Sequence, residues 1–548
     1  MLSDDILLNI FLHYLDATPR LWPILTHVCR RWQQVVLSSP ATLQLRHYCT
    51  HGTPVLKILD RWPPLPLVMN YGGSPMLDPP APEDEVNIIA ALKQSDRVKS
   101  INLTLTNSLL GKLSTISEPF SNLEELVLLS QDKLQQTLPC AFRWGERVRT
   151  LHVTGIVIPS LPQLLASSTD LVDLRLHEIN TDGYFTPQAF ANVLSGASHL
   201  QSLSLHFLSF PRRRTFVALP PPGGHRNVLP ALTCFIYRGT SKYLDSFVAR
   251  IDAPRLGNID ITFFNQPTFD ASQLGQFIRR TDMQTTLTKA YIRTSAHAIS
   301  ISIEDSNTST TPLRLQISCR QLDWQLSSMA QVCDQLSPFL SGVNHWAFNS
   351  DDFPSGQDGV DGGQWQQLIR SFGGITALWI TGELTTDILC ALRPADERGT
   401  TNTAVLPALR NIRVRKPLTL DSPFWDTAQS LVTSRGLSHH PVYWELQVLC
   451  HICNTGFTPQ KLKEHLVAQH AYEIARPNCG EFRLTQAHIH RFQRPLSMGH
   501  PEVAQNDEII SQSPSTPILL QRDTPANWHC SLRDNRSTLR QSRQRTRD

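Results

Sequence analysis

The sequence has few of the features that would place it in a membrane or outside the cell. Its 548 residues contain no apolar run of the roughly 18 residues that a membrane-spanning helix needs. The N-terminus carries Asp4 and Asp5 where a signal peptide would be basic. The 11 cysteines are sparse and odd in number, which is typical of a reducing compartment and not of a disulfide scaffold. We therefore expect a protein of the cytoplasm, the nucleus or both, with no membrane partner.

A strong net charge and the common catalytic motifs are also missing. There are 50 basic and 47 acidic side chains, so the formal net charge is only +3. A protein that coats nucleic acid has a stronger basic field. The sequence contains no Gly-x-Ser-x-Gly, no phosphate-binding loop and no His-Glu-x-x-His. It therefore predicts a protein that is not an enzyme.

What the chain does have is length and a large apolar fraction. At roughly 150 residues per domain, 548 residues hold three or four units. Hydrophobic residues make up 41% of the chain, which is enough for a sizeable core. We predict an α/β protein in five parts: a small all-α unit (1–50), a proline-rich connector (51–95), a repeat solenoid (96–425), a small metal-binding unit (445–500) and a disordered basic tail (501–548).

The first fifty residues have the spacing of short amphipathic helices. The first helix, with Ser3 or Asp4 as its N-cap, has an apolar face. That face consists of Ile6, Leu7, Ile10, Phe11 and Tyr14. A second helix carries a similar face, made of Leu25, Val28, Cys29, Trp32, Val35 and Val36. Because so few short helices bury little area, we expect this unit to gain stability by docking onto a partner.

Two segments of this unit resemble an F-box. They are Leu2–Phe11 (LSDDILLNIF) and His27–Trp32 (HVCRRW), followed by Ser39-Pro40 and Leu43. The family pattern is Leu-Pro-x-(Asp/Glu)-Ile-Leu, then Ile-Phe, then Val-Cys-(Arg/Lys)-x-Trp, and Ser3 stands here in place of the usual proline. The resemblance implies a unit that docks on the adaptor subunit of a cullin–RING ubiquitin ligase. The adaptor contacts that it implies are Leu2, Ile6, Leu7, Ile10, Phe11, Val28, Cys29 and Trp32.

A pattern of apolar-x-x-apolar-x-apolar recurs through the middle of the chain. Its copies start at Val98, Leu123, Val148, Leu171, Leu200, Leu232, Leu256, Val343, Ile375 and Leu409. This spacing suits one strand and one return helix per unit, as in an irregular leucine-rich-repeat solenoid. The alternative is an ordinary α/β or β-rich domain whose strands are evenly spaced.

Some stretches of this region have a recognisable secondary-structure pattern of their own. Helices are predicted over Pro187–Leu194 and Ser328–Leu336. The stretch 276–340 is the least regular, although Ile299–Ile303 and Leu313–Ile317 alternate like strands. An F-box joined to leucine-rich repeats is typical of substrate receptors. The resemblance therefore implies that a concave face of strands binds a target protein.

A group of cysteines and histidines lies near the C-terminus. It forms the pattern Cys-x2-Cys-x11-His-x4-His, at Cys450, Cys453, His465 and His470. Two thiolates on a turn and two imidazoles on a helix face can close a tetrahedron around zinc. With Phe457 and Leu462 as its small core, the segment resembles a ββα Cys2His2 zinc finger, although the inner spacing is one residue shorter than the common one. We expect one structural Zn²⁺ here, and a degenerate second finger up to residue 500.

These features together predict a non-catalytic, substrate-recognition subunit of a cullin–RING ubiquitin ligase. Its partners would be the ligase adaptor, through it a cullin, and a target protein that the sequence does not identify. Two alternatives stay open: a zinc-finger regulator that binds nucleic acid, and an F-box scaffold without a degradation target. Because one finger contacts roughly three base pairs, nucleic acid is not expected to be the main partner.

Overall fold

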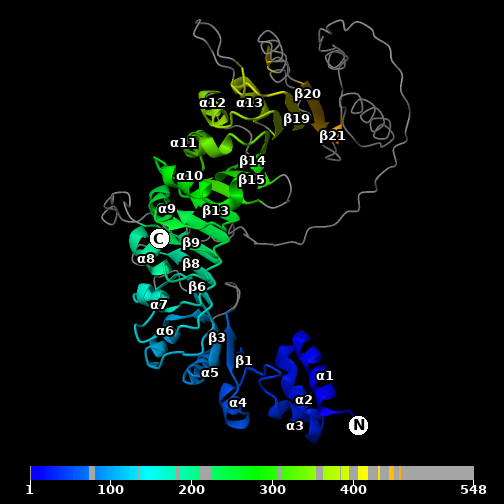
Figure 1. Cartoon of the computed structure of the whole chain (residues 1–548), viewed down its shortest axis with the longest axis vertical. Helices are drawn as coiled ribbons and strands as arrows, with labels where there is room; N and C mark the ends of the chain where they lie inside the picture. Colours follow the sequence, from blue (N-terminus) through cyan, green and yellow to red (C-terminus); the bar gives the residue numbers. More distant parts are fainter. Residues whose placement is uncertain are drawn as a thin grey trace, which may run out of the picture. The chain divides into compact units, whose positions relative to one another are not determined.

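A computed structural model gives the fold of the chain. It describes residues 2–72, 81–131, 136–179, 185–208, 225–285, 287–305, 311–352, 362–382, 384–393, 405–417, 427, 430–431, 443–449 and 456–457. The chain divides into two compact units, 1–493 and 494–548, and every described residue belongs to the first. The described part is a mixed α/β protein built on one large, mostly parallel sheet (Figure 1). None of its helices is both long and apolar enough to cross a membrane.

Short helices form the start of the chain, as the sequence predicts. They are α1 (Asp4–Ala17), a 3₁₀ turn (Pro19–Leu21), α2 (Trp22–Val28) and α3 (Arg30–Ser38). The side chain of Ser3 accepts a hydrogen bond from the backbone N–H of Ile6 and so caps α1, and two aspartates lie at the positive end of the helix. These helices share a core of their own, separate from that of the sheet. We call residues 2–45 the N-terminal helical module.

The second predicted helix is in fact two helices that meet at Cys29. Cys29 has an extended backbone, with φ −161° and ψ 166°, so no single helix passes through it. Its Sγ accepts the backbone N–H of Trp32 at 3.5 Å and takes the N-cap place of α3. The break allows both α1 and α2 to pack against α3.

The stretch predicted as a connector, 51–95, belongs to the sheet and its helices. The elements of this part are β1 (His47–Thr50), α4 (Val55–Arg61), β2 (Leu67–Tyr71) and α5 (Pro82–Leu92). Strand β2 pairs in parallel with β1 and with the following repeat strand. Pro54 is the N-cap of α4 and Pro82 is the first residue of α5. Both prolines therefore stand at the start of a helix, and Pro82 occupies the first helical position, where proline is favoured.

The last two apolar residues of each of the ten copies lie in a strand of the large sheet. These strands are β3 (Val98–Leu105), β4 (Glu125–Ser130), β6 (Thr150–Thr154), β8 (Asp173–Ile179), β9 (Ser202–Phe207), β11 (Cys234–Gly239), β13 (Asn258–Phe263), β17 (His345–Asp352), β18 (Ala377–Gly382) and β19 (Asn411–Pro417). All three apolar positions of every copy are buried. Consecutive strands from β3 to β13, and from β17 to β19, pair in parallel.

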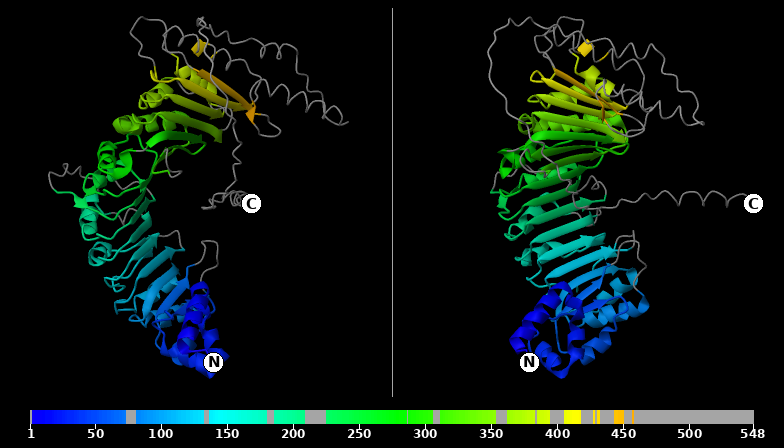
Figure 2. Two further views of the ribbon diagram at one scale, coloured as in Figure 1. Left: turned by 45° about the vertical axis from the view of Figure 1, so that its right-hand side comes forward. Right: turned by 90° about the vertical axis from the view of Figure 1, so that its right-hand side faces the viewer.

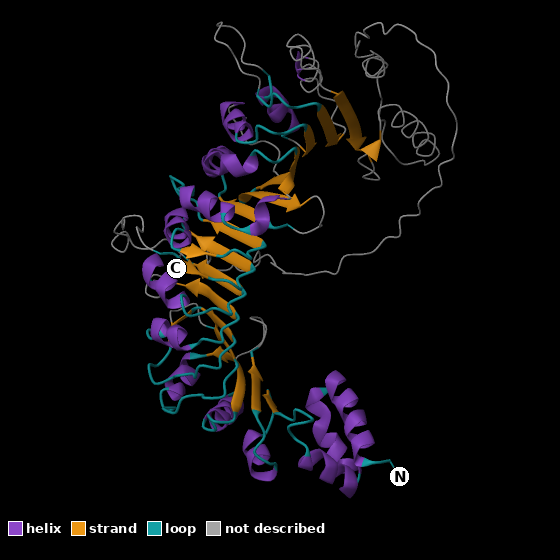
Figure 3. Ribbon diagram, in the orientation of Figure 1, coloured by secondary structure: helices purple, strands orange, loops and turns teal. Residues whose placement is uncertain are grey.

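Among the described residues, return helices cover one face of this sheet and leave the other without helices (Figures 2 and 3). The return helices are α6 (Asn107–Leu113), α7 (Leu161–Ser167), α8 (Pro187–Leu194), α9 (Ser241–Val248), α10 (Ser272–Arg279), α12 (Gly362–Arg370) and α13 (Thr385–Ala391). Two short ladders flank them, β5 (Gln136–Thr137) with β7 (Ile156–Val157), and β10 (Asn227–Val228) with β12 (Ile251–Asp252). Because side chains alternate along a strand, the residues opposite the helices form a second surface. We call it the helix-free face.

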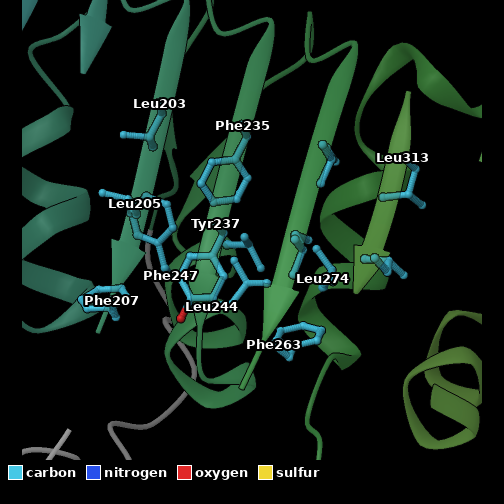
Figure 4. Close-up of a cluster of buried hydrophobic side chains, with 14 of the residues drawn as sticks. Leu203, Leu205, Phe207, Phe235, Tyr237, Leu244, Phe247, Phe263, Leu274 and Leu313 are labelled. Atoms are coloured by element: carbon cyan, nitrogen blue, oxygen red, sulfur yellow. The ribbon is translucent and has the colours of Figure 1, made fainter. Parts of the chain in front are cut away.

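The core between β9, β11, β13 and their helices is rich in aromatic side chains (Figure 4). Phe207 packs against Tyr243 of α9, with ring centroids 4.8 Å apart, and Phe235 packs against Phe247 at 6.1 Å. The buried hydroxyl of Tyr237 donates to the backbone carbonyl of Thr240 at 2.8 Å. A side chain of this size contributes roughly 1.5–3 kcal/mol when it is fully buried. Such contacts hold each helix to its own pair of strands.

The irregular stretch 276–340 contains a local reversal of the strand order. Its elements are β14 (Leu287–Ser295), β15 (Ala298–Asp305), β16 (Leu313–Ser318) and α11 (Leu322–Leu340). Strand β16 pairs in parallel with β13, β15 runs antiparallel between β16 and β14, and β14 pairs in parallel with β17. The spatial order is therefore β13-β16-β15-β14-β17. The sheet continues beyond β19 into β20 (Tyr443–Leu449) and β21 (Gly456–Phe457).

Aromatic contacts join the helical module to the first strand of the sheet. The indole N–H of Trp22 donates to the backbone carbonyl of Arg46 at 2.8 Å. Its ring lies 5.5 Å from that of His47 in β1 and 5.0 Å from that of Trp62. Trp22 is 2% exposed, so this joint is part of the packed interior.

We expect Gly382→Ala, at the end of β18, to destabilise the sheet by about 2 kcal/mol or more. Gly382 has a φ of +102°, and a Cβ there would overlap the hydroxyl of buried Ser350 and lie 2.9 Å from its carbonyl carbon. Urea unfolding followed by circular dichroism measures the effect. Gly111→Ala is the matched control, because Gly111 lies within helix α6 and a Cβ there meets nothing within 4 Å. The control should be neutral or more stable by up to about 1 kcal/mol, and a midpoint of Gly382→Ala at or above that of the wild type would contradict the expectation.

Candidate functional site

The N-terminal helical module carries an unusual share of the exposed apolar side chains. Among the described residues, 14 large apolar side chains are exposed, and seven of them fall within the first 28 residues. The seven are Leu2, Ile6, Ile10, Tyr14, Leu21, Ile24 and Val28. Such a concentration on a small unit is typical of a protein–protein contact. We call these seven residues the apolar surface.

Helix α1 places three of the seven residues of the apolar surface on one stripe. Ile6, Ile10 and Tyr14 are four residues apart and are 47%, 45% and 37% exposed. Leu7 and Phe11 each follow a residue of this stripe, about 100° further round the helix, and are 3% and 0% exposed. A helix with two adjacent apolar stripes can bury one of them in its own module and leave the other for a partner.

An arginine ties the start of α1 to the start of α3. The guanidinium of Arg31 donates to the carboxylate of Asp4 at 2.7 Å and to the backbone carbonyl of Leu2 at 2.6 Å. The side chains of Arg31 and Asp4 are 40% and 64% exposed, so this pair contributes less than about 1 kcal/mol to stability. Its main effect is to hold Leu2 beside the start of α3. Exposed Val28, the last residue of α2, lies close to this point in the chain.

The structure separates the eight predicted adaptor contacts into two groups. Leu2, Ile6, Ile10, Val28 and Cys29 are exposed, whereas Leu7 and Phe11 belong to the module's core. Trp32 is half-buried, and its ring meets that of Phe11 edge-on at 4.8 Å. Leu7, Phe11 and Trp32 therefore pack inside the module and hold helix α1 in place, while the exposed residues are left for a partner. Sequence reasoning missed Leu21 and Ile24, although with Val28 they have the spacing of one helix face.

The helix-free face is the second candidate surface. Its outward residues line up in rows across the strands, because consecutive strands pair in one register. From β2 to β4 these rows hold mostly amide, hydroxyl and aliphatic side chains, with Glu125 as an acidic member: Asn70, Asn102, Thr104, Val127 and Leu129. From β6 onwards the same rows also contain histidine and arginine, beginning with His152. The chemistry of this face therefore changes along the sheet.

Histidines from three neighbouring strands pack together where this change begins. The rings of His177 (β8) and His206 (β9) are stacked with centroids 4.0 Å apart, and His152 (β6) lies 5.1 Å from His177. The hydroxyl of Ser204 is 2.8 Å from Nε2 of His177. Burial, and then the neighbouring His206, lowers the pKa of His177 to about 3. Burial, and then Arg238, lowers the pKa of His206 to about 4, so both rings are neutral near pH 7.

The predicted metal site lies elsewhere in the chain. Cys450, Cys453, His465 and His470 are outside the residues that the structure describes, as are the degenerate second finger and the tail. In the described part of the chain, no group of three or more His, Cys, Asp or Glu residues is placed to hold a metal ion.

A comparison with models of protein families finds none that matches the chain, and a comparison with curated proteins finds no match. The interpretation of both surfaces therefore rests on their residues and geometry.

The histidine cluster should make the stability of the sheet dependent on pH. The unfolded chain takes up protons near the ordinary pKa of 6.5, whereas folded His177 and His206 remain neutral down to about 3 and 4. Stability is therefore full well above pH 6.5 and falls as the pH drops towards 4, by at most about 1.4 kcal/mol per pH unit for each histidine. Urea unfolding at a series of pH values measures this slope.

The double variant His177→Gln/His206→Gln should lose less stability on acidification than the wild type. His199→Gln, at an exposed histidine, controls for the loss of a histidine as such. An equal slope in the wild type and the double variant would show that the cluster is not responsible.

Proposed function

We propose that this protein is a substrate-recognition subunit of a cullin–RING ubiquitin ligase. The observation that carries the proposal is the exposed stripe of Ile6, Ile10 and Tyr14 on a helix whose neighbouring apolar stripe is already buried. The same helix contains the residues that resemble an F-box. An apolar stripe on so small a module, next to Leu2 and Val28, suits docking onto an adaptor subunit.

The large sheet supports the second half of this proposal. Its helix-free face offers outward-facing rows from many strands, and this is a suitable surface for a target protein. The chain itself would do no chemistry. By holding the adaptor at one surface and the target at the other, it would raise the target's effective concentration near the transferring subunits.

Two other functions remain as alternatives to this proposal. An adaptor-binding scaffold without a degradation target would use the same apolar surface, so only the fate of a bound protein separates it from a receptor. A zinc-finger regulator that binds nucleic acid would depend on Cys450, Cys453, His465 and His470. We propose one structural Zn²⁺ at these four residues, held by two thiolates and two imidazoles.

We expect the full chain to capture the ligase adaptor, and Ile6→Asp/Ile10→Asp to weaken this capture at least about tenfold. The two charges would lie in the middle of the apolar surface, while both positions are exposed, so the module should still fold. Quantitative pull-down or biolayer interferometry with purified adaptor measures the loss.

Leu56→Asp/Val86→Asp is the matched control. Leu56 on α4 and Val86 on α5 are 54% and 56% exposed but lie outside the helical module. This control should bind the adaptor like the wild type. The proposal fails if the wild-type chain captures no adaptor, or if both double variants bind it equally well.

We also expect the purified full chain to retain one zinc ion per molecule after dialysis, measured by inductively coupled plasma mass spectrometry. Cys450→Ser/Cys453→Ser should abolish this zinc because it removes both thiolate ligands. Cys140→Ser/Cys390→Ser replaces two exposed cysteines of the described part of the chain and should leave the zinc content unchanged. Zinc content that is equal in the two double variants would rule out the predicted ligands.

A further inference from the structure

The helix-free face carries a set of exposed arginines between β11 and β14. Arg238 on β11, Arg314 on β16 and Arg293 on β14 all face away from the helices and are exposed. Arg238 and Arg293 lie in one row, which runs through Thr262, Gln316 and Ser300. Four strand spacings separate them, about 19 Å at 4.8 Å per strand. Arg314 lies in the adjacent row.

None of the three arginines has an acidic partner at ion-pair distance among the described residues. Arg314 makes one long hydrogen bond, 3.5 Å, to the side-chain carbonyl of Gln316. The nearest acidic neighbour on its own row is Asp260 on the adjacent strand. The three guanidinium groups therefore remain available to a ligand, and arginine suits carboxylates because its fork can bind both oxygens.

Aromatic side chains continue the face on the next strands. Tyr291 on β14 and Trp379 on β18 are 39% and 43% exposed, which is unusual for large apolar side chains on strands of a sheet. They share a row, with the small side chain of Ala347 between them. The guanidinium of Arg413 lies 4.9 Å from the centre of the Trp379 ring. Tyrosine, tryptophan and arginine are the residues that most often dominate binding at protein interfaces.

Acidic groups within the same face argue against a nucleic-acid backbone as its ligand. Asp260 lies beside Arg314, and Glu304 accepts a hydrogen bond from Tyr291. A continuous chain of phosphates would meet these carboxylates, whereas a peptide can place its acidic residues only where the arginines are. Alternate side chains of an extended peptide are about 7 Å apart, so about six residues span the distance from Arg238 to Arg293.

We propose that this face binds an extended acidic segment of a target protein. Its Asp and Glu side chains would pair with Arg238, Arg314 and Arg293, and one aromatic or aliphatic residue would pack between Tyr291 and Trp379. This proposal depends on the proposed function in one respect: it takes the ligand to be a segment of the target protein that the receptor recruits. The binding itself does not need the adaptor, so the two proposals can fail separately.

Fluorescence anisotropy with the full-length chain tests the proposal. The probe is a labelled peptide of about twelve residues that alternates Asp or Glu with Ser and ends in Phe. It should bind, and more weakly as salt is added, because the pairs are exposed to solvent. The same peptide with Asn and Gln in place of the acids should bind at least about tenfold more weakly.

Two pairs of variants locate the binding on this face. Arg238→Gln/Arg293→Gln/Arg314→Gln should weaken the acidic peptide about tenfold. Its control, Arg143→Gln/Arg255→Gln/Arg279→Gln, removes the same charge at exposed positions outside the strands of the large sheet and should bind like the wild type. Trp379→Ala should weaken binding, whereas Trp324→Ala should not, because Trp324 is equally exposed at 44% but lies on helix α11.

Several outcomes would overturn the proposal. Equal binding of the acidic and amide peptides would remove the role of charge, and equal loss in the two triple variants would remove the role of this face. A phosphoserine peptide without Asp or Glu, or a single-stranded oligonucleotide, that binds this face more tightly than the acidic peptide would assign it to a different ligand. Adaptor capture by the arginine triple variant tells the two proposals apart, since it should match that of the wild type.

Discussion

Parallel pairing of strands in one register is the constraint on which the rest of the protein depends. It lines up buried apolar side chains from β3 to β13 and again from β17 to β19, so that each return helix meets a similar surface. Because side chains alternate along a strand, burying one set turns the other set outward. The pairing that builds the core therefore also builds the helix-free face. A slip by one residue would exchange the two sets, so the arginine rows are as firmly specified as the core.

The same constraint explains which parts of the sheet could be predicted. A strand that packs under a return helix needs its apolar triplet, and all ten triplets were visible in the sequence. Strands β14 to β16 alternate like any half-buried strand, and nothing local to them specifies that β15 runs antiparallel or that α11 carries the chain past two strands. In residues 51–95 the prolines suggested a connector. Proline interrupts a helix but is also common at a helix start, and the sequence alone does not distinguish these two roles.

Prediction of the two candidate surfaces was limited by tertiary packing. Ile6 and Leu7, like Ile10 and Phe11, are neighbours of similar apolarity, so the sequence places both pairs on α1 without saying which side is buried. Packing within the module decides this, and it leaves Ile6 and Ile10 outside. The row of outward side chains that contains Arg238 and Arg293 is not visible as a sequence motif. Arg238 and Arg293 share a row only because the chain folds back through β14, β15 and β16.

In the proposed receptor, the joint between module and sheet matters as much as either surface. A receptor works through effective concentration, and a long flexible linker between adaptor and target would lower it. Trp22 is buried between the module and β1, and β1 lies in the same hydrogen-bonded sheet as β11 and β14, seven and eleven strands away. Because residues 51–95 are built into that sheet, strand pairing rather than a flexible connector joins the apolar surface to Arg238, Arg293 and Arg314.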